Sequence, residues 1–198
     1  AEDGPRFVYG SEESYGYMIG SHCRDKDGIV ASCVVAEMSA AAAAEGLTLF
    51  DKLHDLYARF GVRHEWQRNM TFPGKEGAAK IAGILDAIRT HPPKRVGGKP
   101  VLRYTRVDTG DILDGQSGES LGKLPLPSSP VFIFDFADGS KAIARPSGTE
   151  PKIKFYFFLA EEPAAAMTRD GAEAAAARLA TEAPAFEAAF LEAIGYTG

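Results

Sequence analysis

The spacing of apolar residues changes along this chain of 198 residues, and the change limits the folds that it can adopt. In the first half, apolar residues recur mainly every three to four positions, which is the period of an amphipathic helix. In the segments between residues 101 and 159 they alternate with polar residues, which is the period of a half-buried strand, before the chain ends in helical periods again. The predicted helices are 25–46, 49–60, 75–90, 164–182 and 184–194. The predicted strands are 7–10, 65–72, 101–107, 131–136, 141–144 and 153–159.

Short polar signals mark the ends of several predicted elements. Thr48 and Asp51 have the spacing of a capping box at the start of the second helix. The Asp-Gly pair at 138–139 predicts a hairpin turn between two strands. The segment Asp111–Pro130 is rich in Gly, Ser and Pro and is predicted to be a connecting loop. Pro184 is predicted to break the last helical segment in two.

Charge and composition exclude two classes of partner. The formal net charge is −5, which argues against a nucleic-acid-binding protein, although a local basic cluster can still attract an anion. No apolar run approaches the roughly 18 residues that span a bilayer, and no signal peptide opens the sequence. We therefore expect no nucleic acid, no membrane partner and a cytoplasmic location. The opening strand has nothing upstream to pair with, so we expect a piece of a larger protein.

The two cysteines and the acidic residues provide no metal or disulfide framework. Cys23 and Cys33 lie ten residues apart without CxxC spacing, and we expect free, buried thiols, as in a reducing cytosol. No cluster of His, Cys and Asp has the spacing of metal ligands. We therefore expect this chain to hold no metal of its own.

The segment from Arg145 to Lys154 has the residues of a phosphate-binding loop. Arg145 offers a planar fork of donors, and Ser147 and Thr149 offer hydroxyl groups. Gly148 lets the backbone present N–H groups, and Lys154 adds a positive charge. A tight turn between two strands is the structural alternative, since Ser, Gly and Pro dominate turns. The residue types alone leave the two interpretations equal.

A second polar segment lies near the N-terminus. Glu12 and Ser14, two positions apart, would point to the same side of an extended loop. Arg24 and Lys26 follow, and either could bind an anion or be an exposed charge at the start of a helix. Without further information, Glu12 would be interpreted as a solvated surface carboxylate.

Both segments resemble loops of one enzyme family. Arg-Pro-Ser-Gly-Thr-Glu-Pro-Lys-Ile-Lys at 145–154 resembles the phosphate-binding loop of the α-D-phosphohexomutases, the phosphoglucomutase and phosphomannomutase superfamily. Gly10–Gly16 resembles the family's sugar-binding loop, and Arg24–Gly28 resembles the stretch that follows it. The sequence Glu-Glu-Ser-Tyr-Gly-Tyr is most similar to the branch with phosphoglucomutase 2 and phosphopentomutase. The resemblance extends through essentially the whole chain.

The resemblance implies an α+β architecture in two parts. Residues 1–62 would be the C-terminal portion of an α/β sugar-binding third domain. Residues 63–198 would be a phosphate-binding fourth domain, an antiparallel sheet with helices on one face. Composition alone would place the boundary later, at the Pro- and Gly-rich segment 92–98.

The resemblance also implies roles for individual residues. Glu12 and Ser14 would contact the sugar hydroxyls O3 and O4, and Arg24 would also bind substrate. Lys26 would reach the active site and is a possible catalytic residue in proton transfer. The phosphate that is not reacting would be held by Arg145, Ser147, Gly148, Thr149 and Lys154. The roles of Glu13 and His22 are left open.

The family's reaction interconverts sugar 1-phosphates and 6-phosphates through a phosphoserine enzyme and a bisphosphate intermediate. The family's Ser-His-Asn-Pro and Asp-x-Asp-x-Asp loops are absent here. The phosphoserine, Mg²⁺ and the sugar bisphosphate activator would therefore belong to the full-length enzyme and its N-terminal domains, and the isolated chain would be inactive. The alternatives are a stand-alone phosphate or phosphosugar binding module, and a phosphopentomutase as the parent enzyme. Glucose, mannose, glucosamine and pentose phosphates all remain possible substrates.

Overall fold

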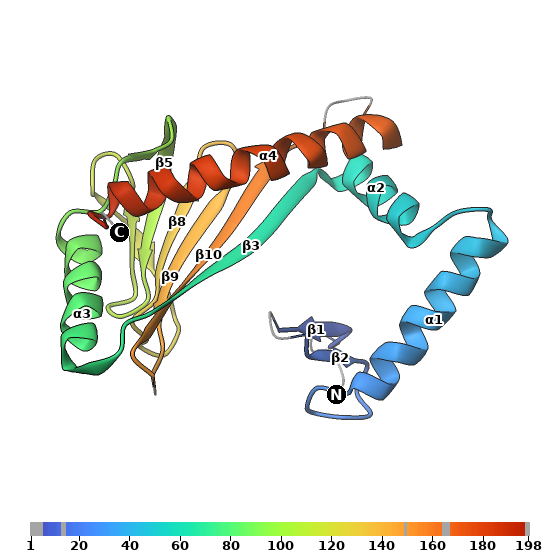
Figure 1. Ribbon diagram of the computed structural model, residues 1–198, viewed down its shortest axis with the longest axis horizontal. Coiled ribbons are helices and arrows are strands. Elements are labelled where there is room, and N and C mark those ends of the chain that lie inside the picture. Colours follow the sequence, from blue (N-terminus) through green and yellow to red (C-terminus); the bar gives the residue numbers. More distant parts are fainter. Residues whose placement is uncertain (1–5, 13–14, 149, 164–166, 197–198) are drawn as a thin grey trace. The chain divides into compact units, whose positions relative to one another are not determined.

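A computed structural model describes residues 6–12, 15–148, 150–163 and 167–196, except for the side chain at position 75. The chain forms two compact units, Ala1–His54 (unit 1) and Asp55–Gly198 (unit 2). Figure 1 shows the helices and strands of the two units. The predicted domain boundary after residue 62 stays a prediction.

Unit 1 contains a small hairpin and helical segments. Strands β1 (Tyr9–Ser11) and β2 (Tyr17–Ile19) pair antiparallel. Helix α1 (Gly28–Ala44) follows, and α2 (Leu49–Phe60) begins in unit 1 and ends in unit 2. The sequence predicted a strand at 7–10 and both helices. It missed β2, whose three residues are too few to show a period.

Local capping explains where these helices begin. The Asp27 carboxylate accepts hydrogen bonds from the backbone N–H groups of Ile29 (2.9 Å) and Val30 (3.2 Å) at the start of α1. At the start of α2, Thr48 Oγ1 accepts from the Asp51 N–H (3.1 Å), and the Asp51 carboxylate accepts from the Thr48 N–H (2.7 Å). The predicted capping box is therefore confirmed.

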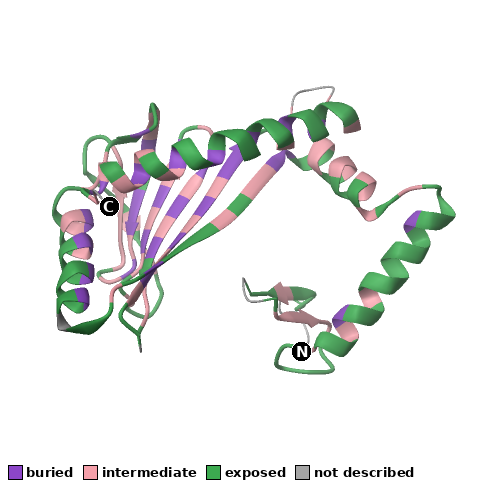
Figure 2. Ribbon diagram, in the orientation of Figure 1, coloured by how far each residue is buried: buried purple, intermediate pink, exposed green. Residues whose placement is uncertain are grey.

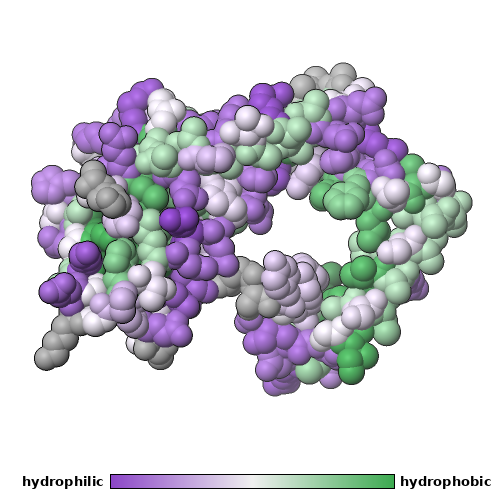
Figure 3. Space-filling view, in the orientation of Figure 1, coloured by the Kyte–Doolittle hydropathy of each residue, from purple (hydrophilic) through white to green (hydrophobic). Residues whose placement is uncertain are grey.

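Most apolar side chains of α1 and α2 are exposed. Only Ala31 and Ala42 of α1 are buried, and no residue of α2 is buried. The side chains of Ile29 and Phe50 are 79% and 73% exposed. Figure 3 shows apolar residues gathered on the surface of these helices. The helical periods were predicted correctly, but among the described residues most of the apolar faces that they define stay exposed; Tyr57 and Ala58 of α2, which are partly buried against the core cluster, are exceptions.

Unit 2 is built on one antiparallel sheet. Its strands lie in the order β3-β10-β9-β8-β5-β6-β7, and β4 pairs with β5. The strands are β3 (Val62–Thr71), β4 (Arg95–Val96), β5 (Lys99–Arg106), β6 (Asp111–Asp114), β7 (Ser120–Lys123), β8 (Phe132–Phe136), β9 (Lys141–Pro146) and β10 (Lys152–Glu161). The two helices are α3 (Gly74–Thr90) and α4 (Arg169–Ala193). Mixed helices and an antiparallel sheet confirm the α+β fold class.

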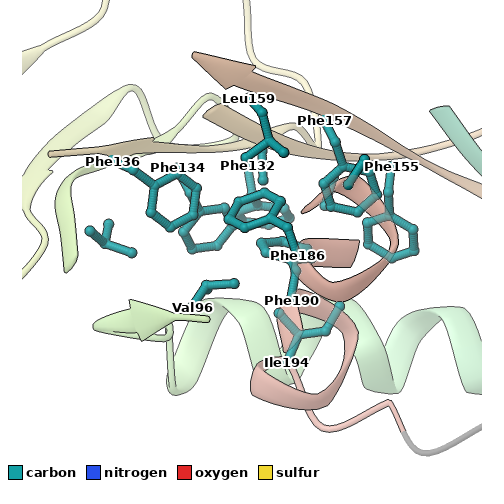
Figure 4. Close-up of a cluster of buried hydrophobic side chains, with 14 of the residues drawn as sticks. Val96, Phe132, Phe134, Phe136, Phe155, Phe157, Leu159, Phe186, Phe190 and Ile194 are labelled. Atoms are coloured by element: carbon teal, nitrogen blue, oxygen red, sulfur yellow. The ribbon is translucent and has the colours of Figure 1, made fainter. Parts of the chain in front are cut away.

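The core of unit 2 lies between the sheet and its two helices. Alternate residues of β10, from Ile153 to Leu159, are completely buried, which shows as bands in Figure 2. Phe186 and Phe190 of α4 meet the strand phenylalanines edge to face (Figure 4). Helix α3 contributes Ile81, Ile84 and Ile88 to the same cluster. The opposite face of β10 carries Lys154, Tyr156 and Phe158, which are only half-buried.

Two predictions for unit 2 were wrong. The segment 111–130 contains the paired strands β6 and β7. Its turn is built by Asp114, whose carboxylate accepts hydrogen bonds from the N–H groups of Gln116 (2.9 Å) and Ser117 (2.8 Å). Helix α4 also runs through Pro184 without a break. Proline removes one helical hydrogen bond, but buried neighbours on both sides, Ala183 and Phe186, hold the helix against the sheet.

The structure bears on two further expectations, the state of the two cysteines and the absence of a membrane-spanning segment. Cys23 and Cys33 are free, as predicted, but both are exposed rather than buried. Within the described residues, no single helix is long and apolar enough to cross a membrane; α1 and α2 meet the criteria of length and composition only as a bent pair.

Candidate phosphate and sugar site

The turn between β9 and β10 is held by its own hydrogen bonds. The Ser147 N–H donates to the Lys152 carbonyl (2.8 Å), and the Lys152 N–H donates to the Glu150 carbonyl (2.7 Å). The Glu150 N–H donates to Ser147 Oγ (3.3 Å). Ser147 therefore closes the turn through its backbone and its side chain. Thr149, the second predicted hydroxyl, lies outside the described residues.

Arg145 and Lys154 are directly opposite each other on β9 and β10. Their neighbours Ala144, Ile153 and Phe155 are buried in the core, so both charged side chains lie on the opposite, open face of the sheet. Arg145 is exposed and makes no ion pair or hydrogen bond with the described residues. The two positive charges therefore lie next to each other on the same face of the sheet.

Lys152 and Glu150 form an ion pair at the tip of the turn. Lys152 Nζ lies 2.6 Å from Glu150 Oε2. The hydrogen bond from Lys152 lowers the pKa of the Glu150 carboxyl group below its ordinary value. The charge of Lys152 is therefore offset within the turn, whereas the exposed guanidinium of Arg145 remains available.

Gly148 leaves open space at the turn. A Cβ atom built there would meet no other atom within 4 Å, and its φ is not in the left-handed region. The backbone conformation itself therefore does not require glycine. The sequence argument that Gly148 keeps side-chain atoms away from a bound anion is compatible with this geometry.

In unit 1, Glu12 lies in the loop between β1 and β2. Its N–H donates to the Gly16 carbonyl (2.8 Å), which closes the loop. Lys26 Nζ lies 3.3 Å from Glu12 Oε1. A Cβ at Gly16 would lie 2.4 Å from Lys26 Cδ, so the lysine chain passes directly over the glycine. Glycine at position 16 thus allows Lys26 to reach Glu12.

Lys26 is held in its charged form. Hydrogen bonds to the carboxylates of Asp25 and then Glu12 raise the pKa of Lys26 above its ordinary value. A lysine with a raised pKa is a poor proton acceptor at neutral pH. The ion pairs with Asp25 and Glu12 thus make Lys26 a hydrogen-bond donor and a positive charge in this loop, and its predicted role in proton transfer stays a prediction.

The other predicted residues of unit 1 divide into two groups. Arg24 is exposed and makes no ion pair or hydrogen bond with the described residues. His22 Nε2 lies 3.3 Å from Asp27 Oδ2, next to the start of α1, which is a structural role. Glu13 and Ser14 lie outside the described residues.

The structure thus brings the predicted residues together in two places. Glu12 and Lys26 meet in unit 1, and Arg145, Ser147 and Lys154 meet in unit 2. Sequence reasoning missed Asn69 on β3, which is opposite Lys154 in the sheet. Strand β3 was predicted, but its partner is more than 80 residues away, so no local signal placed Asn69 beside the turn.

Comparisons with known proteins agree on one family. Residues 1–60 match the family model for the phosphoglucomutase/phosphomannomutase alpha/beta/alpha domain III. A phosphoglucomutase of Staphylococcus epidermidis is 36% identical over 153 residues, covering 77% of this chain and 28% of that protein. A phosphoglucomutase of Staphylococcus saprophyticus is 33% identical over 161 residues, covering 81% of this chain and 29% of that protein.

The chain belongs to the phosphohexomutase superfamily. The match to domain III at the start of the sequence identifies it as a C-terminal part of such a protein, and it spans less than a third of the length of these relatives. A solved structure of the same fold is the open form of pp63/parafusin, a phosphoglucomutase from Paramecium. It matches with a TM-score of 0.50 and 22% identity, over 92% of this chain and 29% of that chain.

The full-length phosphohexomutase is expected to use Mg²⁺, and the described residues do not fit that ion. They contain no group of three or more His, Cys, Asp or Glu residues that could hold a metal. We derive no step through magnesium for this chain.

Proposed function

We propose that this chain supplies the phosphosugar-binding part of an enzyme that moves a phosphoryl group between the 1- and 6-positions of a hexose. The single observation that carries this proposal is the exposed guanidinium of Arg145, without an ion pair among the described residues, opposite Lys154 and next to the Ser147 turn. Family membership supports the reaction class.

In this proposal the β9–β10 turn holds the phosphate that is not reacting. Arg145 can donate two parallel hydrogen bonds to a phosphate edge, and Lys154 adds a charge on the same face of the sheet. Ser147, Gly148 and Thr149 would supply hydroxyl and backbone donors. A bound dianion would also remove the repulsion between the two opposite cations.

The loop of unit 1 would hold the sugar. The Glu12 carboxylate can accept hydrogen bonds from two neighbouring hydroxyl groups, such as O3 and O4, with help from Ser14. Lys26, which is charged and already 3.3 Å from Glu12, would donate to the same hydroxyls. Arg24 would add a second cation to this loop.

The reaction itself would need the remainder of the parent enzyme. The bond between phosphorus and the serine oxygen there would break while the free sugar hydroxyl forms a bond to the same phosphorus. The proton of that hydroxyl would pass to the serine oxygen, which gives a sugar bisphosphate and a free serine. After the bisphosphate reverses its orientation, the serine would recover the other phosphoryl group. In such a transfer, positioning and charge neutralisation do most of the work, and these are the contributions of this chain. Magnesium and a bisphosphate activator would act only in the parent, which we place in the cytoplasm.

Two measurements test this proposal. The purified chain, given glucose 1-phosphate and a bisphosphate primer, should show no turnover above background. Measurable turnover would contradict the assignment of the phosphoserine to the parent.

Titration of the chain with glucose 6-phosphate, followed by NMR, should shift the amide resonances of residues 145–154, and Arg145→Ala should weaken binding at least tenfold. Arg103→Ala is the matched control, because Arg103 lies on the same face but already donates to Asp135 (2.8 Å).

The parent's preferred sugar is a separate question. The Tyr15-Gly16-Tyr17 sequence beside Glu12 favours glucose or pentose phosphate in our interpretation. Kinetics of the full-length enzyme with glucose, mannose, glucosamine and pentose phosphates would decide. A preference for mannose or glucosamine phosphate would contradict it.

A further inference from the structure

The open face of the sheet in unit 2 is organised in rows across its strands. Lys154 of β10 is opposite Asn69 of β3 on one side and Arg145 of β9 on the other. Figure 1 shows these three strands side by side. Since opposite residues of neighbouring strands share a face, Asn69, Lys154 and Arg145 form one row on the open face. This row lies beside the β9–β10 turn.

A second row on the same face shows how such charges are normally balanced here. Lys141, Asp135 and Arg103 are opposite one another on β9, β8 and β5. Asp135 accepts from Arg103 (2.8 Å) and lies 3.3 Å from Lys141 Nζ, so one carboxylate serves two cations. In the row of Arg145 and Lys154, the third side chain is the neutral amide of Asn69. The hydrogen bond from Lys152 and then the charge of Lys154 lower the pKa of the Glu150 carboxyl group at the turn. The charge of this row that has no ion pair among the described residues is therefore that of Arg145.

Asn69 makes no side-chain hydrogen bond among the described residues that would explain an asparagine at this position of the strand. Asparagine is depleted in strands, because its side chain packs poorly on a pleated surface. Asn69 is also exposed. Directly opposite residues have Cβ atoms about 5 Å apart, so an anion held by Lys154 is within reach of the Asn69 amide.

We propose that Asn69 is a third phosphate-binding residue, which donates its amide N–H to a phosphoryl oxygen of the sugar phosphate held by Arg145 and Lys154. This inference rests on the proposed phosphate site. An amide suits the position because it donates hydrogen bonds without adding a third cation. A carboxylate at position 69 would instead complete a row like that of Asp135 and exclude the anion.

The test uses the 198-residue chain and NMR titrations with glucose 6-phosphate and with inorganic phosphate at one pH and ionic strength. Asn69→Ala should raise the Kd for both ligands about fivefold to tenfold, and Asn69→Asp should raise it more than tenfold. Gln67→Ala is the matched control, because Gln67 is the next residue on the same face of β3, opposite Tyr156. Its Kd should stay within twofold of the parent value.

The outcomes separate this inference from the proposed function. If Arg145→Ala abolishes binding while Asn69→Ala leaves the Kd within twofold, the phosphate site stands and the role of Asn69 is refuted, whatever Asn69→Asp does, because an added carboxylate repels an anion without any lost hydrogen bond. If Arg145→Ala also leaves the Kd unchanged, or residues 145–154 show no saturable shifts with the parent chain, both proposals fail. A rise in Kd for glucose 6-phosphate alone would show that Asn69 binds the sugar rather than the phosphate, and would overturn the inference. Unchanged amide shifts of Phe134 and Phe190, which are buried in the core away from the substituted positions, verify the fold of each variant.

Discussion

Helix α1 of unit 1 and strand β10 of unit 2 are both rich in apolar residues, but their environments differ. Along β10, Ile153, Phe155, Phe157 and Leu159 are completely buried under α4. Along α1, only Ala31 and Ala42 are buried. The period of apolar residues therefore predicts whether a segment forms a helix or a strand. Whether that helix or strand is buried depends on partners elsewhere in the chain. Among the described residues, unit 2 contains such partners for its strands, whereas those of unit 1 leave most of α1 exposed.

The free energy of unfolding is therefore expected to come mainly from unit 2. The hydrophobic effect contributes about 25 cal/mol for each Å² of apolar surface that leaves water, and only unit 2 has a contiguous buried cluster among the described residues. Trp66, the single tryptophan of the chain, is stacked on Phe157 within unit 2. Its fluorescence therefore reports the unfolding of unit 2 and separates the two units experimentally.

The largest effect is expected at Phe157. This residue is completely buried and packs edge to face on Phe186 and Phe190. Phe157→Ala should lower the free energy of unfolding of unit 2 by about 3–5 kcal/mol in urea titrations, because it removes buried apolar surface and leaves a cavity. Phe50→Ala, at an exposed position of α2, should change it by less than about 0.5 kcal/mol. Similar losses of unfolding free energy in both variants would contradict the difference in burial between β10 and α2.

A smaller effect is expected at Ser140, a buried polar residue of unit 2. Ser140 Oγ accepts a hydrogen bond from the Ala160 N–H (3.1 Å) of β10. Ser140→Ala would leave that buried N–H without a partner and should cost about 1–2 kcal/mol in the transition reported by Trp66. Ser39→Ala on exposed α1, where Ser39 Oγ donates to the Val35 carbonyl (2.8 Å), should leave this transition unchanged. A loss below about 0.3 kcal/mol for Ser140→Ala would argue against the bond.

Tyr104 joins β5 to α3 and links stability to alkaline pH. Its hydroxyl donates to the Ile88 carbonyl (3.0 Å), and burial raises its pKa above the ordinary value of 10.0. The neutral hydroxyl is therefore favoured in the folded state, and its contribution is complete below pH 10 and falls as the pH rises above 10. Tyr104→Phe should cost about 1 kcal/mol at pH 7 and reduce the alkaline loss of stability. Tyr15→Phe, at an exposed position, should change neither the free energy of unfolding at pH 7 nor its loss at alkaline pH.

The smallest effect is expected at Asp27, the N-cap of α1 in unit 1. Hydrogen bonds, first from the Val30 N–H and then from His22, lower the pKa of the Asp27 carboxyl group. The cap is therefore complete above the ordinary value of 3.8 and is lost as the pH falls through the lowered value. Asp27→Ala should fray only the first turn of α1, measured by the ¹³Cα shifts of Ile29 and Val30, without moving the Trp66 transition. Asp25→Ala, which removes the carboxylate beside Lys26 but no helix cap, should leave those shifts unchanged.

Local signals account for the parts of the fold that the sequence predicted. Asp27, Thr48 and Asp51 fix helix starts by bonds within a few residues, and the alternation along β10 identifies its buried face. Predictions failed where the deciding interaction is distant or the pattern is short. Pro184 remains inside α4 because the sheet holds the helix from the side, and β2 is too short to show a period.

The candidate site divides in the same way. Arg145 and Lys154 lie on the two strands joined by the turn of Ser147, only nine residues apart, so their proximity could be predicted from the sequence alone. Asn69 reaches Lys154 only through the pairing of β3 with β10, which no single segment encodes. The link between Glu12 and Lys26 likewise depends on the lysine chain passing over Gly16, a close approach that composition does not reveal.

The pairing of β3 with β10 also has a consequence for synthesis on the ribosome. All ten residues of β3 pair with β10, which follows about 80 residues later in the chain. At translation rates of 5–20 residues per second, a nascent β3 would wait roughly 4–16 seconds for its partner. The exposed polar side chains along β3 would discourage premature association with other chains during that delay; they are Glu65, Gln67, Arg68, Asn69 and Thr71.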